Sequence, residues 1–165
     1  MKKLFLFSIS LFSVAIIESC GTTRVPAELG VTVMQKVIEV PNVTKDELFV
    51  RANAWAVKQF VSAEAVIEYS DKESGTIMGK YTVDYSRAQT SFRCRQTIAI
   101  EVRDGRIRIT IDDPYEKHIG YGGELIYSKV YKPLKGGSAL PVVNNLWKGT
   151  IASFEKAILE TRENW

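Results

Sequence analysis

Apolar and polar residues alternate along Ser91 to Asp113, and we expect two long strands that fold back on each other at Asp104-Gly105. Asp-Gly is the preferred filling of a two-residue type I′ turn because both central residues need positive φ, and this turn places Arg103 opposite Arg106. The resulting register pairs apolar with apolar positions. One face of the hairpin is then formed by Phe92, Cys94, Gln96, Ile98, Ile100, Val102, Ile107, Ile109 and Ile111.

Weaker patterns predict the elements before this hairpin. Thr32 to Val40 is β-branched and is expected to be the first strand. Thr44 and Glu47 have the spacing of a capping box, so a helix should begin there. Further strands are expected at Ala65 to Ser70 and Thr76 to Tyr85, which form a hairpin. The helix carries a stripe at helical spacing formed by Leu48, Ala52, Trp55, Ala56 and Gln59, in which Trp55 is expected to be a core anchor rather than a ligand-stacking platform.

The segment from Tyr115 to Gly137 is the least regular part of the chain and is expected to be a long loop. Its tyrosines and glycines suit recognition of a peptide, a glycan or a small ligand, or they pack against their own domain. The candidate binding residues in it are Tyr115, His118, Tyr121, Tyr127 and Tyr131. A second amphipathic helix is predicted from Ser138 to Asn164, in which Gly149 is expected to mark close contact with the sheet.

The amino terminus has the features of a secretory signal over residues 1–19, with two lysines before an apolar run that is too short to span a bilayer comfortably. Cys20 stands where bacterial lipoproteins are acylated, although Glu18 departs from that pattern. We therefore expect a lipidated cysteine, a tether over residues 20–31 and a single domain over residues 32–165. If Cys20 is not lipidated, the protein is secreted. Because no acidic run follows Cys20, a periplasm-facing location is favoured over surface display.

Charge and cysteine content narrow the possible partners. Removal of residues 1–19 lowers the formal charge from +3 to +2, which argues against a general binder of nucleic acid. Cys94 lies on the apolar face of a strand, where it should behave as a small hydrophobic residue.

Two amphipathic helices and a sheet with one apolar face pack economically when both helices cover that face. The predicted fold is therefore a two-layer α+β domain with a single, largely antiparallel sheet in the order β-α-β4-α. The helix from Asp46 to Phe60 and the turn sequence DKESGTIMGK at Asp71 to Lys80 resemble an uncharacterised bacterial family found in exported lipoproteins, described as having a TATA-binding-protein-like (TBP-like) fold. The resemblance covers Val33 to Asp113 and implies a fold and an envelope location, but no activity.

The polar face of the sheet is the main candidate for an interaction surface. Its cations are Lys80, Arg93, Arg95, Arg103, Arg106 and Arg108. Glu101 should lie opposite Arg108, whereas Arg103 and Arg106 should repel each other near the turn. This face is either a solvated surface kept charged against aggregation or a docking surface for an acidic protein patch or anionic lipid headgroups.

No recognisable catalytic motif accompanies the single histidine, His118. The sequence also lacks the spacing of a zinc site and a glycine-rich phosphate loop. Asp112-Asp113 precedes Pro114 and is expected to be a turn rather than a catalytic pair. The sequence therefore predicts a non-enzymatic binding or scaffolding lipoprotein of the cell envelope with no cofactor and no metal. The alternative is a periplasmic ligand-binding domain that uses residues 115–137.

Overall fold

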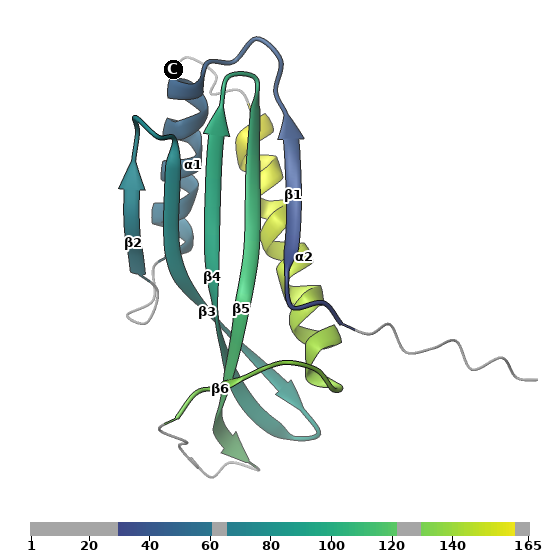
Figure 1. Ribbon diagram of the computed structural model, residues 1–165. Helices are drawn as coiled ribbons and strands as arrows, with labels where there is room; N and C mark the ends of the chain where they lie inside the picture. Colours follow the sequence, from purple (N-terminus) through teal and green to yellow (C-terminus); the bar gives the residue numbers. More distant parts are fainter. Residues whose placement is uncertain (1–29, 61–65, 122–129, 161–165) are drawn as a thin grey trace, which may run out of the picture.

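The computed structural model describes residues 30–60, 66–121 and 130–160. The predicted signal, Cys20, most of the tether and Tyr127 lie outside these residues. One antiparallel sheet has the strand order β1-β5-β4-β3-β2, and a short sixth strand pairs with β5 (Figure 1). The strands are β1 (Met34–Glu39), β2 (Val66–Asp71), β3 (Thr76–Arg87), β4 (Thr90–Arg103), β5 (Arg106–Tyr121) and β6 (Lys132–Pro133).

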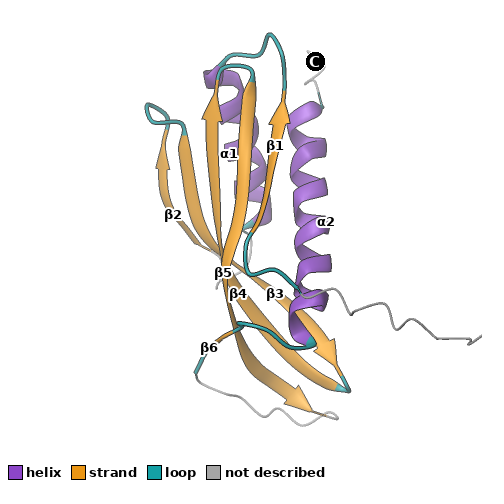
Figure 2. Ribbon diagram, turned by 45° about the vertical axis from the view of Figure 1, so that its right-hand side comes forward, coloured by secondary structure: helices purple, strands orange, loops and turns teal. Residues whose placement is uncertain are grey.

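Both helices, α1 (Lys45–Gln59) and α2 (Ala139–Leu159), lie against the same face of the sheet (Figures 1 and 2). We call this the inner face and the opposite one the outer face. The predicted two-layer arrangement is therefore confirmed. Trp55 of α1 packs edge-on against Phe154 of α2, with ring centroids 4.9 Å apart, so it is the expected core anchor. The isoleucine rows of β4 and β5 are fully buried beneath the two helices.

The hairpin between β4 and β5 has the predicted register. Arg103 faces Arg106, and Gly105 has a φ of 73°. The predicted type I′ turn is wrong, because it needs positive φ at both central residues and Asp104 does not have it. The adjoining hairpin between β3 and β4 turns at Ala88-Gln89, two residues other than glycine that both have positive φ. The start of α1 also has the predicted cap, because the hydroxyl of Thr44 accepts the backbone N–H of Glu47.

The prediction that a loop begins at Tyr115 is wrong, because residues 115–121 continue β5. The pairing with β4 is maintained by a β-bulge at Asp113-Pro114, where three steps along β5 match two along β4. Asp113 adopts a φ of 54° there. Asp112-Asp113 thus forms a bulge inside the strand rather than the end of the sheet, because a bulge lets the strand continue past a proline that has no N–H to donate.

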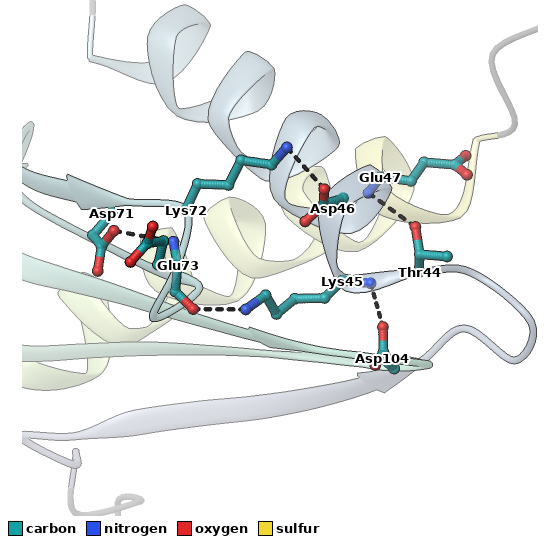
Figure 3. A network of polar contacts seen from close by, with 8 residues as sticks. All are labelled: Thr44, Lys45, Asp46, Glu47, Asp71, Lys72, Glu73 and Asp104. Carbon is teal, nitrogen blue, oxygen red and sulfur yellow. Dashed lines mark hydrogen bonds and ion pairs between the residues drawn. The ribbon is translucent and has the colours of Figure 1, made fainter.

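Three turns meet at one end of the domain and are joined by polar contacts (Figure 3). The backbone N–H of Lys45 donates to Asp104 at 2.7 Å, and the ammonium of Lys45 donates to the carbonyl of Glu73 at 2.7 Å. Lys72 and Asp46 form an ion pair at 2.9 Å. The turn at residues 71–75, which we call the DKESG turn, therefore joins β2, β3, the start of α1 and the tip of the β4–β5 hairpin.

Helix α2 differs from the prediction at Gly149. This glycine is exposed, and a Cβ built on it would have no atom within 4 Å, so it does not contact the sheet. The close approach to α2 occurs instead at Gly30, where a Cβ would lie 2.5 Å from the Cβ of Leu140. Beside it, the side-chain amide of Asn144 accepts the N–H of Val31 at 2.7 Å and donates to its carbonyl at 2.8 Å. The start of the described chain is thus fixed on the first turns of α2.

Candidate docking face of the sheet

The outer face carries the predicted cations, and carboxylates of the same face neutralise three of them. Lys80 pairs with Glu68 at 2.5 Å. Arg93 makes a two-pronged contact with the carboxylate opposite it, with Nε and Nη2 at 2.6 and 2.8 Å from the two oxygens of Asp84. The predicted pair of Arg108 with Glu101 is also present, with Nε 2.6 Å from the carboxylate. These three cations therefore contribute little unbalanced charge.

Arg95 is engaged differently, by an aromatic side chain from the segment next to β6. Its guanidinium carbon lies 4.4 Å from the ring centroid of Tyr131, and Nζ of Lys117 lies 4.7 Å from the same centroid. Both distances are within the range of cation–π attraction. The structure therefore brings together one member of the predicted arginine surface and one member of the predicted tyrosine loop, which sequence reasoning had treated as separate sites.

Arg103 and Arg106 differ from the other four cations. Both are exposed, and they face each other across the hairpin. Glu39 of β1 stands opposite Arg106 in the register, but neither arginine takes part in an ion pair within the described chain. We call these two residues the arginine pair. They border a hollow of about 190 Å³ that is also lined by Val37, which is 49% exposed, and by the paired Glu101 and Arg108. The outer face thus presents two arginines without an ion pair beside an apolar side chain and a neutralised pair.

The bulge in β5 creates a second feature, on the inner face, that the sequence analysis missed. Beyond the bulge the alternation of β5 is reversed, so Glu116 and His118 stand opposite Cys94 and Phe92 of the inner face. The hydroxyl of Tyr85 donates to the Glu116 carboxylate. From the sequence alone, this cluster could have been found only by noticing that the inward-facing positions of the strand shift by one residue at Asp113-Pro114.

Burial determines the chemistry of this inner cluster. It raises the pKa of the Cys94 thiol to about 12, and the nearby Glu116 carboxylate raises it further. Burial also raises the pKa of the Tyr85 hydroxyl, as does its hydrogen bond to Glu116. Both shifts are opposite to those that activate a nucleophile, which needs a lowered pKa or an adjacent base.

Cys94 should therefore be unreactive in the folded protein. In a Cys20→Ser background, we expect its alkylation by iodoacetamide at pH 8 to be on the order of 1,000-fold slower than that of an exposed cysteine, because both the thiolate and access to it are lacking. Mass spectrometry at timed intervals measures the rate. The same chain in denaturing urea is the control and should react fully. Rapid alkylation without denaturant would contradict the burial of Cys94.

The carboxyl of Asp112, next to the bulge, should make the stability of the fold depend on pH. Burial raises the pKa of its carboxyl, and the charge of Asp113 raises it further. A pKa that is higher in the folded state means that ionisation lowers stability as the pH rises through it. Asp112→Asn should therefore be more stable than the wild type at pH 7, by less than about 1 kcal/mol because Asp112 is partly solvated, and the difference should vanish below about pH 4.

Asp71→Asn is the control of opposite sign for this pH series. Hydrogen bonds from Ser74 and Glu73 lower the pKa of the Asp71 carboxyl, so its contribution to stability is present at neutral pH and is lost as the pH falls through its folded-state pKa. Thermal unfolding across the pH range measures both variants. A stabilising effect of Asp112→Asn that persists unchanged in acid would show that it does not arise from ionisation.

Among the described residues, no group of three or more histidine, cysteine, aspartate or glutamate side chains is placed to hold a metal ion. Neither of the helices in the described ranges is long and apolar enough to cross a membrane.

A six-stranded antiparallel sheet with two helices on one face is a TBP-like α+β fold. The sequence profile of the domain of unknown function DUF4468, described as having this fold, matches residues 34–117, and the chain belongs to that family. The resemblance noted from the helix and the DKESG turn is thereby confirmed.

Two solved bacterial structures are similar in fold. A DUF4468 family protein from Bacteroides ovatus is 14% identical, with a TM-score of 0.58 over 81% of this chain and 89% of that one. A TBP-like protein from Parabacteroides distasonis is 20% identical, with a TM-score of 0.56 over 74% of this chain and 92% of that one. At these identities the likeness concerns the fold alone. No protein with a curated description matches the sequence.

Proposed function

We propose that this protein is a non-enzymatic binding module of the cell envelope, held to a membrane through lipidated Cys20, whose outer face docks an anionic partner. One observation carries the docking part of the proposal. Both helices cover the inner face, no described helix covers the outer face, and the outer face presents the arginine pair without an ion pair among the described residues. Two exposed cations without an ion pair on a sheet face favour electrostatic association with an anionic partner.

The anchoring part is supported by the sequence of the first twenty residues and by the distance to the domain. Ten residues lead from Cys20 to Gly30, and a chain of that length reaches at most about 35 Å when fully extended. Because Asn144 fixes Val31 on α2, that tether would hold the whole domain within a few nanometres of the bilayer.

Lipidation can be tested directly. The mature amino-terminal peptide should begin at Cys20 and carry acyl chains, which mass spectrometry detects. Cys20→Ser should move the protein from the membrane fraction to the soluble envelope fraction. An unmodified cysteine, or a Cys20→Ser protein that remains in the membrane fraction, would remove the anchor from the proposal.

Docking can be tested in intact cells with a photo-crosslinking amino acid at Val37, which lines the hollow beside the arginine pair. The same group at Ala152, exposed on α2, is the control position. We expect discrete adducts from position 37 only, and we expect Arg103→Gln with Arg106→Gln to abolish them. Adducts that survive this double substitution, or that are equal at both positions, would contradict docking at the outer face.

A further inference from the structure

We infer that the arginine pair binds acidic side chains of a partner protein, rather than phosphate groups of lipid. This inference rests on the proposed docking function and names the class of partner. Its basis is the pattern by which the outer face neutralises its own arginines, together with the rigidity and the apolar border of the site.

The outer face neutralises arginine by placing a carboxylate on the neighbouring strand. Arg93 faces Asp84, and Arg108 faces Glu101, each with close contacts to the opposing carboxylate. In the row next to the turn, Arg103 faces a second arginine, Arg106, and like charges directly opposite each other are destabilising. Glu39 of β1 faces Arg106 from the other side, but no ion pair joins them in the described chain. This row therefore holds two arginines and one carboxylate, and a carboxylate supplied by another protein would balance the second arginine.

The acidic residue nearest in sequence is already engaged. Asp104, between the two arginines, accepts the backbone N–H of Lys45 at 2.7 Å (Figure 3). The turn itself is fixed on both sides, because Gly105 donates to the carbonyl of Val43 at 2.9 Å and accepts the N–H of Val40 at 2.8 Å. The two guanidinium groups therefore project from a rigid base, which reduces the entropy lost on binding.

Two features favour a protein over a membrane surface. The hollow beside the arginine pair includes half-exposed Val37, which gains from contact with apolar atoms that a headgroup layer lacks. Two arginines near an anionic bilayer raise binding by only about 30-fold, and the formal charge after removal of residues 1–19 is small. A guanidinium makes two-pronged contacts with carboxylate and phosphate alike, so the choice of a protein partner rests on Val37 and on the small net charge.

The arrangement of the chain agrees with this choice. The described chain enters the sheet at the start of β1, whereas the arginine pair lies beside the far end of that strand (Figure 1). The pair is thus about 20 Å from the point where the tether meets the sheet, the length of the six-residue strand β1. A tether that reaches about 35 Å does not force this end of the domain against the bilayer, so the arginine pair is available to a neighbouring protein.

The test compares two probes on the Cys20→Ser mature chain: a short polyglutamate peptide, and vesicles of phosphatidylcholine with phosphatidylglycerol. NMR titration should show peptide-induced shifts centred on the amide of Gly105, and these should weaken with added salt. Arg103→Gln with Arg106→Gln should lower the peptide affinity at least about tenfold. The control variant, Lys58→Gln with Lys148→Gln, removes the same charge from exposed helix positions. It should change the peptide affinity less than about threefold.

Each result decides between the alternatives. Peptide binding that depends on the arginine pair, without comparable vesicle binding, supports a carboxylate-bearing partner. Vesicle binding through the same two arginines, without peptide binding, would overturn the inference but leave anionic docking intact. Failure of both probes would remove the docking proposal as well, and equal losses in the two double variants would show that only net charge matters. Unchanged thermal unfolding of both variants confirms that their folds are intact.

Discussion

Gly75→Ala is expected to lower the free energy of unfolding by about 3 kcal/mol, the largest effect that we predict. Gly75 has a φ of 73°, and a Cβ built on it would lie 2.6 Å from the carbonyl oxygen of Val102. That backbone has little freedom to move, because the N–H of Val102 donates to the carbonyl of Gly75 at 2.8 Å. Strain and steric overlap therefore act together. Urea unfolding followed by circular dichroism measures the loss.

The chain contains a matched control for this substitution. Gly149→Ala places the same methyl group in the exposed middle of α2, where no atom lies within 4 Å. Alanine has the higher helix propensity, so this variant should be more stable than the wild type by about 0.5–1 kcal/mol. If both glycine variants change stability by the same amount and sign, close packing at the DKESG turn is not the cause.

Arg51→Met is expected to lower the free energy of unfolding by about 2–3 kcal/mol, the second largest effect. Arg51 lies on α1 and is buried, and its Nη1 donates at 2.7 Å to the carbonyl of Ile158 in the last turn of α2. The last carbonyls of a helix lack partners within the helix, so the guanidinium satisfies one of them. Methionine keeps the apolar stem but leaves that buried carbonyl without its bond.

Glu47→Gln is the control for this prediction. The Arg51 guanidinium also contacts Glu47, but that side chain is 56% exposed. An exposed ion pair within one helix contributes less than about 1 kcal/mol, so Glu47→Gln should lower the free energy of unfolding by less than that amount. If Glu47→Gln were as damaging as Arg51→Met, the ion pair within α1 would matter more than the link between the two helices. Chemical denaturation under identical conditions compares the two variants.

Several parts of the fold could be predicted because short-range physics determines them. Gly105 allows a tight turn because it tolerates positive φ, and Thr44 with Glu47 fixes a helix start by capping. The alternation of β4 and the isoleucines of β5 determine which face is buried. The register that follows correctly placed Arg103 opposite Arg106 and Glu101 opposite Arg108.

Other parts could not be predicted because they depend on neighbours that are distant in sequence. The length of β5 was missed because Asp112-Asp113-Pro114 has the composition of a strand end, and only pairing with β4 stabilises a bulge there. The contact of Arg95 with Tyr131 joins residues 36 positions apart in sequence. Gly149 was misjudged because a glycine in a helix indicates close packing only where a neighbour is present.

The sequence by itself determined the two-layer class, the buried face and the arginine-rich outer face, since each follows from periodicity and local turn chemistry. The tertiary structure alone decided which of those arginines are neutralised, where the bulge turns Glu116 and His118 inward, and which glycines have no room for a side chain. These outcomes depend on distances between strands and helices, and a linear pattern of residue types does not contain those distances.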